Sequence, residues 1–188
     1  MLITAASSSV GPAAIEVTNL LGGVPLAVTR TPAKKKALLD AGAAAVIASG
    51  EEDLPEAVRH YTGGRGADLI FDAVAGPGLE IMAQSAALGG QIIEYCWLSS
   101  APTPFPLFAA FQKGLTVRGY TLYEFVNDPK LRPEAERFVA SNLEQGKLRP
   151  QIDRTFPLSQ IVDAHRYLES SQQIGKGVVT TGGIGDGN

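Results

Sequence analysis

Short apolar runs alternate with amphipathic stretches along the first two thirds of the chain. The apolar runs predict buried strands at residues 2–5, 24–29, 44–48, 67–75, 90–96 and 115–122. The stretches between them carry apolar residues at helical spacing and predict helices at 12–21, 32–43, 51–61, 78–88 and 107–114. Strands that are continuously apolar are typical of a parallel sheet with helices on both faces. The repeated strand–helix units therefore predict an α/β protein with a doubly wound parallel sheet, the Rossmann fold.

The pattern changes after Leu122. A helix at 132–148, an extended segment at 151–158, a helix at 159–171 and a strand at 175–181 predict a C-terminal helix-strand-helix-strand extension. The glycine-rich end offers nothing to bury and predicts a flexible tail. We therefore divide the chain into a nucleotide-binding domain at 1–122, the extension at 123–181 and the tail at 182–188.

Composition excludes several classes of protein. The net charge of −3 gives no reason to expect nucleic acid or an anionic membrane as a partner. The single cysteine, Cys96, cannot form an internal disulfide. The chain has only two histidines, His60 and His165, so it is poorly suited to a zinc site. The sequence has no secretory signal and no run of about 20 apolar residues that could span a membrane. We therefore expect a cytoplasmic protein.

The loop "AASSSVG" after the first strand is the first candidate for chemistry. In a dinucleotide-binding fold this turn feeds a helix whose N-terminus holds the pyrophosphate. The three glycine positions of the usual fingerprint fall on Ala6, Ser8 and Gly11, so only the last is glycine. Serine is small, caps helices and can donate to a phosphate oxygen. By itself the loop fits a phosphate site and a simple strand-to-helix turn equally well.

The end of the second strand favours the phosphate site. An NAD site needs Asp or Glu there, about 20 residues beyond the glycine loop, to hold the ribose diol. This strand ends instead in Thr29, Arg30 and, within one turn, Lys34. Cations without an opposing acid suit an adenosine 2′-phosphate. The sequence therefore indicates NADP(H) rather than NAD(H), whereas Lys35 and Lys36 are interpreted as solvated lysines.

Several sequence segments, taken in order, resemble those of a known family. They are "LITAASSSVGPAAIEVTNLLG", "TRTPAKKKALLDAGAAAVIA", "YTGGRGADLIFDAVAG", "GLTVRGYTLYEF" and "IDRTFPLSQIVDAHRYLESSQQIGKGVV". Their order and spacing resemble the medium-chain dehydrogenases/reductases, in particular the zinc-independent, quinone-oxidoreductase-like branch. The resemblance covers the whole chain except the glycine-rich tail. It implies a Rossmann fold, an NADP(H) cofactor and hydride transfer to a quinone or an enone as small-molecule substrate.

The resemblance also implies where the cofactor lies. The pyrophosphate would meet Ser7, Ser8, Ser9 and Val10, and the 2′-phosphate would meet Thr29, Arg30 and Lys34. The fourth, fifth and sixth strands would bring residues to the adenosine ribose, the nicotinamide ribose and the carboxamide, and Lys176 would reach the phosphates from the last strand. Those strand-end residues are Ala73, Val74, Tyr95, Cys96, Tyr120, Thr121 and Leu122.

No catalytic acid or base stands out in the sequence. Asp72 is interpreted as a hydrogen-bonding residue at a strand end. Hydride transfer from a reduced nicotinamide depends mainly on orientation and a protected site, so this absence is compatible with the chemistry. Two alternatives stay open: a non-catalytic NADP-binding module, and an interaction protein that binds no nucleotide.

Two further expectations concern surfaces. Family members carry a β-rich catalytic domain before the first strand, and the segment after Leu122 resembles the part that folds back onto it. The resemblance therefore implies that the helix and last strand of the extension expose apolar surface. It also implies a homodimer formed through the strand 115–122.

Overall fold

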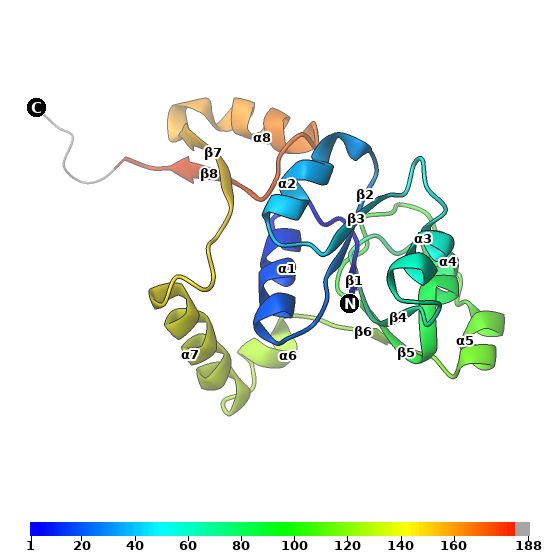
Figure 1. The fold of residues 1–188 in the computed structure, drawn as a ribbon. Helices are drawn as coiled ribbons and strands as arrows, with labels where there is room; N and C mark the ends of the chain where they lie inside the picture. Colours follow the sequence, from blue (N-terminus) through cyan, green and yellow to red (C-terminus); the bar gives the residue numbers. More distant parts are fainter. Residues whose placement is uncertain (183–188) are drawn as a thin grey trace, which may run out of the picture.

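The chain folds around one six-stranded parallel sheet (Figure 1). The structure, a computed structural model, describes residues 1–182. The strand order is β3-β2-β1-β4-β5-β6, and each neighbouring pair is parallel. The order reverses between β1 and β4, and sheets of this kind bind their ligands at the carboxyl ends of the strands beside such a reversal. The strands are β1 (Leu2–Ile3), β2 (Leu26–Thr29), β3 (Ala45–Ala48), β4 (Ala67–Asp72), β5 (Ala86–Glu94) and β6 (Thr116–Gly119).

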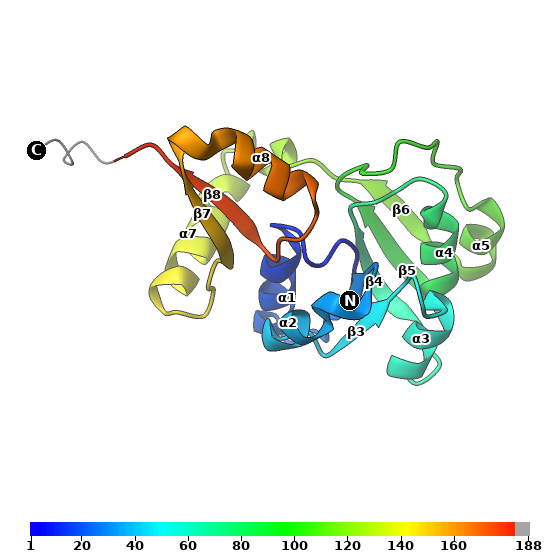
Figure 2. The ribbon, with the colours of Figure 1, turned by 90° about the horizontal axis from the view of Figure 1, so that it is seen from above.

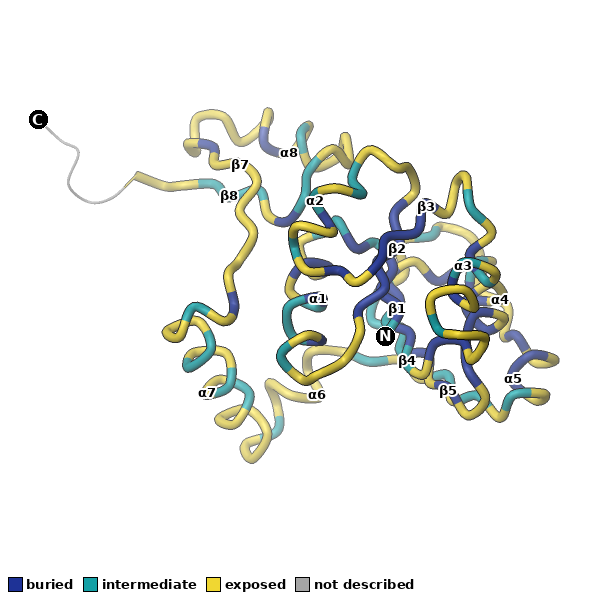
Figure 3. The backbone as a smooth tube through the Cα atoms, in the orientation of Figure 1, coloured by how far each residue is buried: buried dark blue, intermediate teal, exposed yellow. Residues whose placement is uncertain are grey.

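Helices lie on both faces of the sheet, as the continuous apolar strands predicted. One face packs on α1 and α2 through Ile15 and Leu38, which are fully buried. The other packs on α3, α4 and α5, and its core includes Val58 and Met82. The buried residues concentrate in these two layers (Figure 3). The helices are α1 (Gly11–Leu20), α2 (Lys35–Asp40), α3 (Leu54–Tyr61), α4 (Gly78–Ser85) and α5 (Leu107–Lys113).

The predicted helix-strand-helix-strand extension is confirmed. After a short helix, α6, the chain forms α7, β7, α8 and β8, and β7 pairs with β8 in a separate parallel sheet. This sheet and α8 lie beyond the α1 and α2 side of the main sheet (Figure 2). Of the predicted tail, 182–188, only Gly182 falls within the described residues. The bounds are α6 (Tyr123–Val126), α7 (Leu131–Glu144), β7 (Ile152–Pro157), α8 (Ile161–Glu169) and β8 (Lys176–Thr180).

Much of the apolar surface of the extension is exposed to solvent. No residue of α7 is buried, and Leu131, Val139 and Leu143 are all more than 40% exposed. In β8 the valines Val178 and Val179 are half-buried. The expected apolar exposure is therefore present on the helix and weaker on the final strand.

Several predicted elements differ in extent, and two of the differences have a clear structural cause. The helix predicted over 78–88 ends at Ser85, because Ala86 turns to extended geometry and pairs with Ala67 at the start of β5. The strand predicted over 115–122 was too long: β6 covers only Thr116–Gly119. It stops there because Leu122 adopts helical geometry (φ −53°, ψ −30°) as the N-cap of α6.

Candidate cofactor-binding site

The serine loop lies between β1 and α1, at the carboxyl edge of the sheet. Ser8 Oγ accepts hydrogen bonds from the amides of Val10 and Gly11, both at 3.3 Å, and so closes the first turn of α1. Ser7 and Ser8 are half-buried, whereas Ser9 and Val10 are exposed. Ala5 holds a left-handed conformation with φ +44°, which is strained for a residue with a side chain. Such strain is typical of a turn that must present backbone to a ligand.

Gly11 sets how close α1 comes to this loop. A Cβ at this position would lie 2.0 Å from the carbonyl oxygen of Ala6 and 2.3 Å from its carbon. Both atoms are backbone, so no side-chain rotation could relieve the contact. Of the three fingerprint positions, this one requires glycine, and the helix N-terminus consequently lies directly over the loop where a pyrophosphate would sit.

The end of β2 brings both predicted cations to the serine loop. Lys34 Nζ donates to Ser7 Oγ at 3.0 Å, so the lysine and the loop meet across 27 residues of sequence. Arg30 lies near enough to lower the pKa of Lys34, although burial of the lysine is the larger cause. Thr29 is buried and Arg30 is exposed, with no hydrogen bond or ion pair of its guanidinium within residues 1–182. No acid follows β2 in the sequence as far as Lys34, and the carboxylate that acts on Lys34 comes from β7, where Asp153 lies near enough to raise the pKa of the lysine.

Lys34 also ties the extension to the loop. Its ammonium donates to the carbonyl oxygens of Ser171 and Gln173, each at 2.7 Å. The amide of Gly175 donates to the carbonyl of Ser7 at 3.1 Å. All three Lys34 protons are thus engaged within the chain. Lys176, the predicted basic residue of the last strand, is exposed and is the first residue of β8. Its neighbour Gly175 is the residue that contacts the serine loop.

The residues after β4 are fixed by a buried aspartate. Asp72 is 1% exposed, and its carboxylate accepts from the Thr4 hydroxyl and from the amides of Val74 at 3.1 Å and Ala75 at 2.8 Å. Thr4 Oγ1 in turn accepts from the amide of Ala73 at 2.9 Å. The interpretation of Asp72 as a hydrogen-bonding strand-end residue is confirmed. Ala73 is buried, whereas Val74 is 38% exposed at the edge.

The residues after β5 and β6 continue this edge. Tyr95 stacks on Phe71 with ring centroids 3.9 Å apart, and burial, with Cys96 and Asp72 nearby, raises the pKa of Tyr95 to about 12. Cys96 is half-buried. These two predicted positions lie side by side with Ala73 because β4 and β5 are neighbours in register.

The backbone after β6 is already engaged. The amide of Tyr120 donates to the carbonyl of Glu94 at 2.9 Å, and the amide of Thr121 donates to Glu124 at 3.2 Å. The carbonyl of Leu122 accepts from Phe125 and Val126 within α6. Two of the amides predicted to meet the carboxamide are therefore used within the chain in this structure.

Sequence reasoning missed Glu94. It is paired in register with Asp72 on β4, and both of its carboxyl oxygens are buried without a donor from any described group. Burial and the nearby Asp72 raise the pKa of Glu94 to about 8. One signal was available, because Glu94 is the only charged residue of the predicted strand "GQIIEYC".

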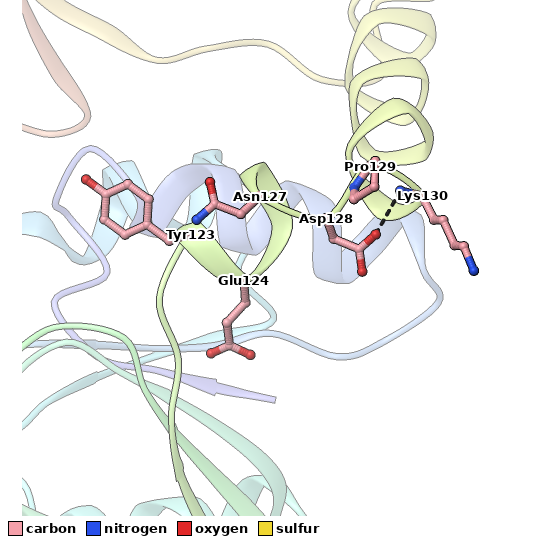
Figure 4. A pocket seen from close by; sticks show the side chains of 6 residues that line it. All are labelled: Tyr123, Glu124, Asn127, Asp128, Pro129 and Lys130. Atoms are coloured by element: carbon pink, nitrogen blue, oxygen red, sulfur yellow. Dashed lines mark hydrogen bonds between the residues drawn. The ribbon is translucent and has the colours of Figure 1, made fainter.

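Two surface hollows lie away from this edge. One, of about 470 Å³, lies where α6 leads into α7 and is drawn in Figure 4, where the Asp128 carboxylate accepts from the amide of Lys130 at 2.7 Å. The other, of about 530 Å³, is lined by Arg59, Arg65 and Lys113 at the amino ends of β4 and β5. Neither includes a residue of the serine loop or of the carboxyl edge.

Fold and site together define a class: a Rossmann-like α/β domain with a serine loop after β1 and cations after β2. A family profile described as zinc-binding dehydrogenase matches residues 41–179. The chain belongs to this family, within the medium-chain dehydrogenase/reductase superfamily, and is quinone-oxidoreductase-like.

Individual relatives agree with this assignment. The chain is 28% identical over 172 residues to quinone oxidoreductase 1 of Escherichia coli, a match that covers 90% of this chain and 53% of that protein. It is 29% identical over 185 residues to a highly reducing polyketide synthase, ltbA, of Aspergillus luteorubrus, covering 95% of this chain and 6% of the synthase. The crystal structure of E. coli quinone oxidoreductase complexed with NADPH superimposes with a TM-score of 0.86 at 27% identity, covering 95% of this chain and 56% of that one.

In the quinone oxidoreductases, the matched region is the cofactor-binding half. The chain spans about half the length of the quinone oxidoreductases and reductases that it matches, and a small part of the polyketide synthases.

The donor set does not suit zinc, despite the name of the family. Within the described residues no three His, Cys, Asp or Glu side chains come together as a metal site. Cys96 ends β5, whereas His60 and His165 lie on α3 and α8. We therefore assign no step to a metal. Among the described helices none is long and apolar enough to cross a membrane.

Proposed function

We propose that this chain binds NADPH at the carboxyl edge of its sheet and belongs to an oxidoreductase that reduces a quinone or an enone. The observation that carries the proposal is the contact of the serine loop with Lys34 at the cationic end of β2, a strand that no acid follows as far as this lysine. Phosphate binding to a helix N-terminus and to nearby cations needs this combination. When bound, the cofactor would supply a hydride.

The residues of the chain would hold and orient the cofactor. The Ser7–Val10 loop and the N-terminus of α1 would hold the pyrophosphate. The exposed guanidinium of Arg30 is the group best placed to take a 2′-phosphate, because the protons of Lys34 are already donated to Ser7, Ser171 and Gln173. Lys34 would then act at the phosphate only by exchanging one of these partners. Ala73, Val74, Tyr95 and Cys96 would line the path from the adenosine ribose to the nicotinamide ribose.

A substitution of Arg30 tests the cofactor preference. A charge-assisted hydrogen bond contributes about 1.5–3 kcal/mol, so Arg30→Ala should weaken NADPH binding about 10- to 100-fold. NADH lacks the 2′-phosphate, so its affinity should change little. Isothermal titration calorimetry with both cofactors measures this, with Arg65→Ala at the opposite edge of the sheet as the control. Equal losses for both cofactors, or no loss for either, would refute the assignment of Arg30.

The alternative is a non-catalytic NADP-binding module. The described residues correspond to the cofactor-binding half of the quinone oxidoreductases, and no acid or base among them is assigned to the reaction. A steady-state assay with NADPH and a quinone separates the two: turnover supports the enzyme, whereas binding without turnover supports the module.

We also propose that two copies associate through the edge strand β6. This strand has a neighbour on one side only. Beside it, α5 contributes Ala109 to the core cluster that Val117 of β6 joins, while Leu107, Phe108 and Phe111 are at least 70% exposed. An unpaired edge with adjacent apolar side chains is suited to association with another strand edge.

A further inference from the structure

The carboxyl edge of the sheet carries a buried pair of carboxyl groups that the proposed cofactor chemistry does not use. Asp72 ends β4 and Glu94 ends β5, and the two residues are partners in register. In a parallel sheet, residues paired in this way point to the same face. Glu94 has Gly119 as its register partner on the other side, in β6, so no side chain at that position can donate a hydrogen bond to it.

The two carboxyl groups differ in the donors that they meet. Asp72 accepts from the Thr4 hydroxyl and from the amides of Val74 and Ala75. Both oxygens of Glu94 are buried and receive nothing from any N–H or O–H of the described residues. An ionised carboxyl that is buried without donors would be costly.

No cation is available to offset this charge. The segments that follow the two strands, 73–79 and 95–112, contain no Lys, Arg, His, Asp or Glu, and their titratable side chains are Tyr95 and Cys96. On β6 the nearest cation is Arg118, whose register partner is Ile93 and whose guanidinium pairs with Glu124. On α4 the exposed Glu80 accepts from Gln84, and at the far end of α5 Lys113 donates to the carbonyls that end α4.

We propose that Glu94 is a positioning residue for the cofactor: it carries a proton at neutral pH, donates it to the Asp72 carboxylate, and thereby keeps the ends of β4 and β5 together. The resulting chain of hydrogen bonds runs from the amide of Ala73 through Thr4 and Asp72 to Glu94. In support, the pKa of Glu94 is raised to about 8 by burial and by Asp72, which lies within hydrogen-bonding reach.

The consequence for binding follows from the position of the pair. Asp72 fixes the amides of Val74 and Ala75, and the backbone carbonyl of Glu94 fixes Tyr120. Loss of the Glu94 proton to solvent would put two negative charges side by side in a buried place. The segments that begin at Ala73 and Tyr95 would then move apart, and these are the segments assigned above to the cofactor riboses. This step rests on the proposed function.

The test compares the pH dependence of NADPH binding in the wild type and in Glu94→Gln, which keeps the donor and cannot ionise. We expect wild-type affinity to fall at least about 10-fold between pH 7 and pH 9, and the affinity of the variant to fall less than about twofold. Glu80→Gln, an exposed carboxyl on α4, should retain the wild-type profile. A Glu94→Gln profile that still falls as the wild type does would overturn the proposal.

A second measurement does not depend on the cofactor. Infrared difference spectroscopy of the whole chain across the same pH range should show the carbonyl band of a protonated carboxylic acid at pH 7, lost by pH 9 and absent from Glu94→Gln. If that band is missing at pH 7, the protonation of Glu94 is refuted. If the band is present and NADPH binds at no pH, the proposed function fails while the protonated pair stands.

Discussion

Gly11→Ala is the sharpest test of the geometry of the serine loop. The added Cβ would lie 2.0 Å from the carbonyl oxygen of Ala6, whereas ordinary contacts begin at 3.4 Å. The N-terminus of α1 would therefore have to retreat by about 1.4 Å in a close-packed interior, or the turn would have to refold. Overpacking of this kind typically costs 1–3 kcal/mol. We expect a loss near the top of that range, about 3 kcal/mol, because backbone lies on both sides of the contact.

Gly78→Ala is the matched control. Gly78 is also the first residue of a helix, α4, and a Cβ there would meet nothing within 4 Å. Removing a helical glycine in open space should stabilise the chain by about 0.5 kcal/mol. For a chain of this length, 1 kcal/mol shifts the melting temperature by about 2–4 °C. Gly11→Ala should therefore melt about 6–12 °C below the wild type, and Gly78→Ala at or slightly above it.

Thermal unfolding followed by circular dichroism measures both variants, and calorimetry at a temperature where both are folded measures NADPH binding. Because Gly11 brings the amide end of α1 over the phosphate position, its variant should also bind NADPH more weakly, whereas Gly78→Ala should bind as the wild type does. The reasoning is refuted if Gly11→Ala melts within about 2 °C of Gly78→Ala, since the helix would then not be held by contact with Ala6.

Two further predictions concern association and pH. Phe111→Lys, at a side chain 84% exposed on α5, should shift the light-scattering mass from two chains toward one, whereas Leu21→Lys, 73% exposed at the end of α1, should not. Folding raises the pKa of Glu94 from its ordinary 4.5 to about 8, so the folded chain binds this proton more tightly than the unfolded chain. The resulting stability is fully present below pH 4.5 and is lost as the pH rises toward 8, and the urea midpoint of Glu94→Gln should lack this decline. A parallel decline in both proteins would contradict it.

Much of the fold could be predicted because each element carries its own local pattern. The strand at 44–48 is continuously apolar, and Pro32 and Gly42 bound the next helix region, so these segments are recognisable without tertiary information. The limits of β6 and α4 could not be predicted in this way. Apolar residues continue past Gly119 and past Ser85, so the sequence does not show where β6 and α4 end. The helix α4 ends because Ala86 pairs with β4, and the strand β6 ends because the chain turns into α6.

The candidate site also has a part that could be predicted from the sequence and a part that could not. Lys34 could be predicted as part of the site because its charge and its distance from the strand end are visible in the sequence. Its partners could not be, since the carbonyls that it holds lie 137 and 139 residues further along the chain. The consequence for binding is specific: Arg30 offers a guanidinium without a partner in the described structure, while Lys34 must give up one of its three hydrogen bonds before it can meet a phosphate.

For Glu94, the sequence identifies the residue but does not indicate its protonation state. A glutamate at the end of a strand is ordinarily solvated and ionised. Its neutral form follows only once β4 and β5 are placed in register, because Asp72 then faces it and has already taken the three donors at hand. Because the surroundings of Glu94 are assembled from β1, β4 and β5, no pattern in the sequence near this residue indicates them. The same assembly that creates the cofactor edge therefore also determines whether this carboxyl holds a proton, and the pH dependence of binding reports on the sheet register itself.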